Sequence, residues 1–196
     1  MITKLSQLDL TKTYSYADYV TWKLNERVEL MKGLIIKMSP APSSQHQSIS
    51  MNLAGIIFQH LKGKNCKVFS APFDVRLINK RKSTTDKEIT TVVQPDLCII
   101  CDLKKVDERG CLGSPDLIIE ILSKGNTKKE LENKFDLYQE NGVKEYWVVQ
   151  PGDETVVVFD LIRGKYQYRK IYSNDGVVPV KVIKGLEIDL KEVFEI

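Results

Sequence analysis

The sequence has no apolar run long enough to cross a membrane. Its longest apolar stretches, such as 117–122 with Glu120 inside it, fall far short of the ~20 residues that a spanning helix needs. The first five residues lack the continuous apolar core of a signal peptide, and low-complexity segments and internal repeats are absent. We therefore expect a cytoplasmic protein that has no membrane partner.

Cysteine and histidine are scarce, with four cysteines and two histidines in the chain. Cys98 and Cys101 have the spacing of a zinc knuckle, but the residues around them are typical of a buried strand. No second Cys or His pair follows at a suitable spacing. The sequence therefore predicts reduced cysteines, most of them in the core, and no zinc site.

A strong excess of one charge is also missing, because 29 basic residues face 26 acidic ones for a net charge of +3. This balance is compatible with a polyanionic partner but does not require one. The length of 196 residues fits a single domain covering 1–196.

Capping signals and hydrophobic periodicity predict a mixed α/β fold. The predicted core covers about 45–150 in the order αβββαβ, with one β-hairpin before it and one after it. The expected helices are 45–61 and a second one from Thr127 to Gly142, and the expected core strands are 67–78, 91–101, 116–122 and 144–150. The expected hairpins are 28–36 and 155–171, and the stretches 79–90 and 102–114 are expected to be loops.

Two acidic residues occupy positions where a purely structural sequence would place apolar ones. Glu120 lies inside a strand that otherwise looks buried on both faces. Asp96 follows Pro95, and a proline within a strand indicates a bulge or a strand edge that can aim the acid. A buried carboxylate must be paired, protonated or bound to a metal.

Metal-assisted phosphodiester hydrolysis is a chemistry that uses such a pair. Two carboxylates on neighbouring strands can hold Mg²⁺, which prefers oxygen ligands and activates water, and a nearby lysine can orient that water. Residue 122, which would share the strand face of Glu120, is leucine, and Lys124 falls in the following turn. Lys134, beside the apolar stripe of the next helix, is the preferred lysine.

The same residues also allow a structural interpretation, in which Lys134 only neutralises a buried acid. His60 lies on an apolar helix stripe and is expected in the core. His46 lies at a helix start and is a weaker candidate for the site.

Several short motifs occur in one order along the chain: ELMKG (29–33), MSP (38–40), HQ (46–47), APFDV (71–75), QPD (94–96), PDLIIEILS (115–123) and GVKEYWVV (142–149). Over roughly 16–194 the chain resembles a bacterial family known as "putative restriction endonucleases", formerly a domain of unknown function. Two positions depart from that family's usual pattern, Lys32 before the glycine and Lys124 after the serine.

This resemblance implies a restriction-endonuclease-like fold of the PD-(D/E)XK class and a Mg²⁺-dependent endonuclease acting on DNA, with Mn²⁺ as a substitute. Carried over by position, Asp96 and Glu120 match the two motif acids, and Lys134 matches a lysine displaced onto the following helix. Glu29 matches an upstream acid that completes the metal shell, although a solvated hairpin residue is the alternative. Asp74 is a weaker candidate.

Three functions stay open at this point. The first is the DNA endonuclease, which needs two active sites to cut a duplex and so favours a homodimer. The second is a nucleic-acid-binding protein of the same fold without activity. The third is a structural protein whose acids form internal ion pairs.

Overall fold

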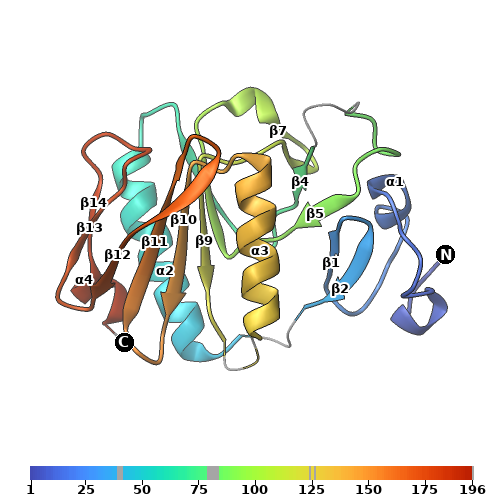
Figure 1. The fold of residues 1–196 in the computed structure, drawn as a ribbon, viewed down its shortest axis with the longest axis horizontal. Helices are drawn as coiled ribbons and strands as arrows, with labels where there is room; N and C mark the ends of the chain where they lie inside the picture. Colours follow the sequence, from blue (N-terminus) through green and yellow to red (C-terminus); the bar gives the residue numbers. More distant parts are fainter. Residues whose placement is uncertain (39–41, 79–83, 124, 126, 196) are drawn as a thin grey trace.

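Two six-stranded mixed sheets carry the fold in the computed structural model (Figure 1), which describes residues 1–38, 42–78, 84–123, 125 and 127–195. The helices are η1 Leu5–Gln7, α1 Tyr16–Tyr19, α2 Ser44–Leu61, η2 Leu103–Lys105, α3 Lys128–Asn141 and α4 Leu190–Phe194. The strands are β1 Val28–Met31, β2 Leu34–Lys37, β3 Lys67–Ser70, β4 Val75–Leu77, β5 Thr91–Val93, β6 Leu97–Ile100, β7 Val106–Asp107, β8 Gly110–Leu112, β9 Leu117–Ile121, β10 Glu145–Gln150, β11 Thr155–Ile162, β12 Lys165–Ser173, β13 Val177–Pro179 and β14 Glu187–Asp189.

We call the two large sheets the N-terminal sheet and the central sheet. The N-terminal sheet has the order β2-β1-β5-β4-β8-β7, and the central sheet has the order β12-β11-β10-β9-β6-β3. Strands β13 and β14 form a separate pair. The elements α2, β3, β6, β9, α3 and β10 follow one another along the chain, and all four of these strands belong to the central sheet.

The side chains of the central sheet alternate between two cores. Leu97, Ile119 and similar residues pack with the apolar stripe of α2 on one face. Their sequence neighbours Cys98 and Ile118 pack with α3 on the other face. Figure 1 shows α3 in front of the boundary between the two large sheets. Strand residues that alternate with Cys98 and Ile118 on the same face therefore point toward α3. A charged residue on that face of β9 has α3 as its neighbouring element.

Two predicted strands are each divided between the two sheets. The segment 67–78 forms β3 in the central sheet and β4 in the N-terminal sheet, and 91–101 is divided in the same way into β6 and β5. The interruptions fall at Pro72 and Pro95, and proline cannot donate a ladder hydrogen bond. The prediction of one continuous strand over 67–78 was therefore wrong, whereas the predicted break at Pro95 is confirmed.

The remaining elements agree closely with the expectations. The capping box at Thr127 and the left-handed Gly142 bound α3, and Ser43 caps α2 by accepting a hydrogen bond from the backbone N–H of His46. The segment 102–114 was expected to be a loop, but it contains the short hairpin β7–β8. Of 79–90, residues 79–83 lie outside the described part of the chain. No helix in the described residues is long and apolar enough to cross a membrane.

A disulfide joins Cys66 and Cys101, so the prediction of four reduced cysteines was wrong for this pair. Cys66 precedes β3 and Cys101 follows β6, and the antiparallel register that pairs Lys67 with Ile100 brings the two cysteines face to face. Cys98 and Cys111 are free and buried, as expected.

The disulfide predicts a large stability difference on reduction. Its sequence separation is 35 residues, and closing a loop of that size restricts the unfolded chain enough to contribute roughly 3–4 kcal/mol. Urea unfolding with and without dithiothreitol measures this difference. Reduction should destabilise the wild type but leave Cys66→Ser unchanged, and the same loss in both proteins would contradict the linkage.

Candidate active site

Glu120 lies in the middle of the hydrophobic strand β9, and its side chain is only 8 % exposed. It has the same parity as Ile118, which packs under α3, so its carboxylate also faces that helix. An unpaired carboxylate at this depth would be strongly destabilising.

Helix α3 supplies two partners to one carboxylate oxygen. Lys134 Nζ donates to Glu120 Oε1 at 2.8 Å, and the Tyr138 hydroxyl donates to the same oxygen at 2.5 Å. Lys134 and Tyr138 are four residues apart and therefore share one face of the helix. The predicted reach of Lys134 back to the sheet is confirmed.

Glu29 on β1 brings a second carboxylate to the same lysine. Its Oε1 lies 3.7 Å from Lys134 Nζ and accepts a hydrogen bond of 2.7 Å from the backbone N–H of Gln94. The side chain of Glu29 is 3 % exposed, so the interpretation as a solvated hairpin residue is wrong.

Asp96 lies beside Glu120 because Leu97 pairs with Ile119 across β6 and β9. Its Oδ2 accepts a hydrogen bond of 2.7 Å from the backbone N–H of Ile121, and its Oδ1 lies 3.3 Å from Nε2 of His46. His46 is buried in the first turn of α2, and its Nδ1 has no hydrogen-bond partner among the described residues.

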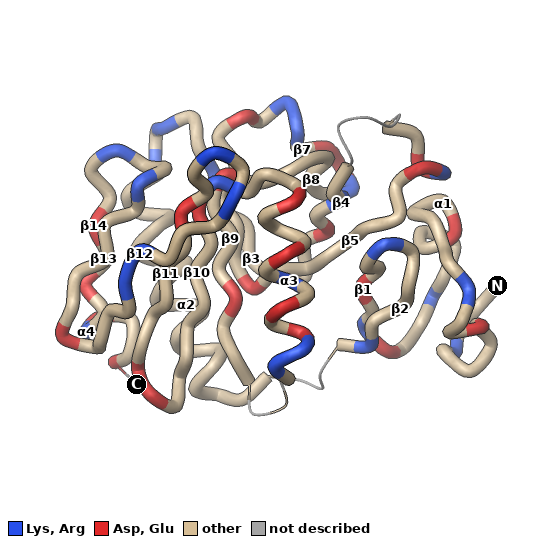
Figure 2. Tube along the Cα trace, in the orientation of Figure 1, with Lys and Arg blue, Asp and Glu red and all other residues tan. Residues whose placement is uncertain are grey.

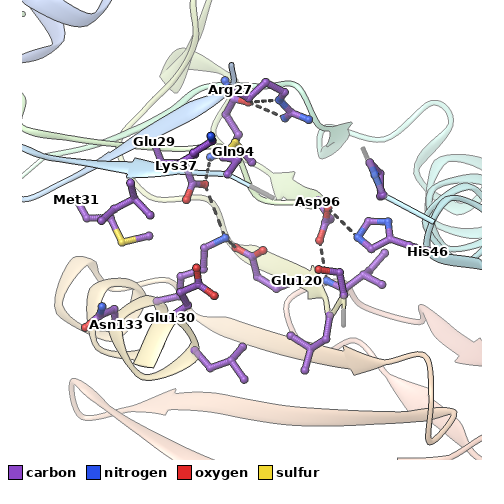
Figure 3. A pocket seen from close by; sticks show the side chains of 18 residues that line it. Arg27, Glu29, Met31, Lys37, His46, Gln94, Asp96, Glu120, Glu130 and Asn133 are labelled. Carbon is purple, nitrogen blue, oxygen red and sulfur yellow. Dashed lines mark hydrogen bonds and ion pairs between the residues drawn. The ribbon is translucent and has the colours of Figure 1, made fainter. Parts of the chain in front are cut away.

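Apart from Tyr138, these side chains line one cavity of about 150 Å³. Figure 3 shows the carboxylates of Glu29, Asp96 and Glu120 around one space, with His46 beside Asp96. Arg27 and Lys37 line the same cavity. Glu130, from the capping box of α3, also lines the cavity, so the site combines four carboxylates with several cations at the point where the two large sheets meet.

The electrostatics of the cluster oppose full ionisation. Burial, reinforced by the charges of Asp96 and Glu29 and only partly offset by Lys134, raises the pKa of Glu120 to about 7. For Lys134, burial works against the charged form, but the two glutamates outweigh it and raise the pKa. Hydrogen bonding to Asp96 raises the pKa of His46 against the opposing effect of burial. Lys134 therefore stays charged, whereas Glu120 holds its proton more tightly than an ordinary glutamate.

The structure brings together most of the predicted residues. Glu29, His46, Asp96, Glu120 and Lys134 all line the cavity. Asp74 lies apart in a neighbouring cavity, where Gln94 and Tyr19 donate hydrogen bonds to its Oδ1. The alternative lysine at 124 lies outside the described residues. His60 is half-buried with its Nε2 2.6 Å from Lys64 Nζ, so it is not a fully enclosed core residue.

Two contacts of the site were missed by sequence reasoning. Tyr138 was not among the predicted site residues, although its spacing from Lys134 places its hydroxyl on the same carboxylate. Gln94 positions Glu29 through its backbone and binds Asp74 and Arg27 through its side chain. The position of Gln94 directly before Pro95 could have indicated this role, because a strand break frees backbone groups for such contacts.

Within the described residues, no group of three or more His, Cys, Asp or Glu side chains is arranged to hold a metal ion. Lys134 is bonded to Glu120 and near Glu29, so a cation already occupies the space between these two acids.

The mixed α/β fold is shared with a solved structure titled "putative nuclease belonging to DUF820" from Anabaena variabilis. The two superpose with a TM-score of 0.70, covering 92% of this chain and 97% of that chain at 20% identity. This likeness defines the class of fold.

The family follows from the sequence match. Residues 16–191 match the family described as "Uma2: Putative restriction endonuclease", and the chain belongs to this family. The chain is also 26% identical over 126 residues to the "Uncharacterized protein slr1290" of Synechocystis sp.. That match covers 63% of this chain and 61% of the length of the relative.

The raised pKa of Glu120 predicts a pH-dependent stability. Because its folded pKa of about 7 lies above the model-peptide value of 4.5, its stabilising contribution is complete below pH 4.5 and is lost as the pH rises through 7. Glu120→Gln removes this loss. Urea unfolding in EDTA from pH 4.5 to 7.5 should show the wild type losing on the order of 1–3 kcal/mol relative to the variant. Parallel curves would contradict the account.

Proposed function

We propose that this protein is a divalent-metal-dependent endonuclease that hydrolyses DNA phosphodiester bonds in the cavity between the two large sheets. The observation that carries the proposal is the convergence of Asp96 and Glu120 beside the buried Lys134. Family membership supports a nuclease, because the family is described as "Putative restriction endonuclease".

The donor set fits Mg²⁺. Asp96 and Glu120 belong to neighbouring strands and offer carboxylate oxygens, the ligands that Mg²⁺ prefers, and one or two protein carboxylates with water and substrate phosphate are its usual environment. No three-residue cage is therefore needed. Asp96 and Glu120 would hold the ion with water and phosphate as further ligands, and Mn²⁺ would take the same ligands; Glu29 would contribute only after Lys134 moves away from it. When bound, the metal polarises the phosphate and lowers the pKa of the attacking water.

The side chains of the protein would orient the attacking water, stabilise the developing charge and position the metal ligands. Lys134 stays protonated beside the acids, so its ammonium group can orient a water molecule and offset the negative charge that develops on the phosphate. Tyr138 and the backbone of Ile121 fix Glu120 and Asp96 by hydrogen bonds, and Gln94 does the same for Glu29. His46 holds Asp96 from the opposite side.

Phosphate binding is expected to be local. Among the described residues Lys and Arg are scattered between Asp and Glu, without one continuous basic face in the view of Figure 2. Arg27 and Lys37 line the cavity together with Lys134 and would meet the phosphates there. Because the described part of the chain carries one such cluster of acids beside a lysine, we propose that cutting both strands of a duplex takes a homodimer.

Plasmid nicking tests the proposal. Supercoiled plasmid is incubated with the wild type and with Asp96→Asn, Glu120→Gln and Lys134→Met, each in Mg²⁺, in Mn²⁺ and in EDTA. We expect metal-dependent nicking by the wild type and a loss of roughly 100-fold or more in each variant.

Asp116→Asn provides the matched control. Asp116 is also buried, directly precedes β9 and pairs with Lys144, but it does not line the cavity. Nicking should survive in this variant once its folding is verified by circular dichroism. Intact plasmid with folded wild type in both metals, on duplex and single-stranded substrates alike, would favour a binding protein without activity.

A further inference from the structure

A second cavity, of about 510 Å³, adjoins the active-site cavity. Arg27 and Gln94 line both cavities. The backbone N–H of Gln94 bonds Glu29 in the first, and its side-chain amide bonds Asp74 in the second. Gln94 therefore lies in the wall between the two cavities.

The walls of the second cavity are aromatic. Tyr19 and Trp22 are partly exposed there, with their ring centroids 5.8 Å apart, and Tyr19 stacks on the buried Tyr16. Arg109 lies over the Tyr16 ring at 5.3 Å. Partly exposed aromatic rings beside guanidinium groups are the surfaces on which nucleobases stack.

The cavity also carries a partly buried acid, Asp74. Both hydrogen bonds that this carboxylate receives within the described residues, from Gln94 at 2.8 Å and Tyr19 at 3.4 Å, fall on Oδ1. Oδ2 is left for a donor on a ligand. Asp74 is half-buried, and this burial raises the pKa of its carboxyl group. An acid here repels phosphate and accepts hydrogen bonds from an amino group.

We propose that the second cavity holds an unpaired nucleobase with an exocyclic amino group, such as cytosine or adenine. The base would stack against Tyr19 and Trp22 and donate its amino hydrogens to Asp74. The identity of the ligand rests on the proposed function, since the base belongs to the strand whose phosphate enters the first cavity.

This arrangement makes unpaired DNA the better ligand. A base within a duplex has to leave its stack before it can enter a side cavity, and that step costs pairing and stacking energy. Thymine has no exocyclic amino group, and its one donor, N3–H, lies between two carbonyl oxygens that the Asp74 carboxylate would repel.

Binding without metal tests the inference apart from cleavage. Fluorescence anisotropy in EDTA follows fluorescein-labelled oligodeoxycytidylate and oligothymidylate, each about 12 nucleotides long, titrated with the full-length protein at one salt concentration. We expect the wild type to bind the cytosine strand about tenfold more tightly than the thymine strand. Asp74→Asn should bring this ratio close to one, because an amide also donates to the thymine carbonyls.

Matched variants separate specific effects from general ones. Glu26→Gln removes an acid that also lines the cavity, and it should change both affinities equally. Trp22→Leu should weaken both strands about tenfold, and Trp22→Phe should restore most of that loss. Tyr168→Leu, at an exposed aromatic residue outside the cavity, should have no effect.

Equal affinity of the wild type for the two strands, or an unchanged ratio in folded Asp74→Asn, would overturn the base-binding cavity. The outcome is independent of nicking. A protein that nicks plasmid but shows no base preference keeps the nuclease and loses this cavity. A protein that shows the preference without nicking keeps the cavity and loses the nuclease.

Discussion

The rest of the molecule depends on the interruption of two adjacent strands at Pro72 and Pro95. At each proline the chain leaves one large sheet and enters the other, and the backbone N–H of Ala71 bonds the carbonyl of Asp96 to hold the two interruptions together. Ladder hydrogen bonds cannot continue through proline. The sheets separate at this point, and the gap exposes the end of β6 and the middle of β9 to side chains from β1 and α3.

The charged cluster at this gap costs stability. Glu29, Glu120 and Lys134 are taken out of water, and a buried ion pair commonly gives no more stability than well-packed apolar residues of the same volume. The surrounding groups reduce the cost: Tyr138 and the backbone of Gln94 donate to the two glutamates. Even so, the pKa of Glu120 stays well above its ordinary value. A purely structural pair would not need to line an open cavity with Asp96 and His46, so this arrangement favours a catalytic role for the cluster.

Sequence reasoning located much of the site because β9 is so hydrophobic. A glutamate within Leu117–Ile121 stands out at once, and the capping box at Thr127 fixes the phase of the helix that carries Lys134. The division of two strands between separate sheets was not predictable, since a proline indicates a break but not which sheet the chain joins next. The Cys66–Cys101 pairing depends on the register of β3 and β6, and register is a property of the assembled sheet. For the same reason, the burial of Glu29 follows only from the pairing of β1 with β5.

The central claim is that Asp96 and Glu120 bind one divalent metal ion in the cavity beside Lys134. Anomalous diffraction from crystals grown in Mn²⁺ tests it most directly, because the signal locates the ion without any assumption about activity. The account predicts one strong peak between the two carboxylates, within ordinary Mn²⁺–oxygen distance of both, and its absence from crystals of Glu120→Gln. A wild-type map without a peak at this position, or with its peak on other residues, would contradict the account.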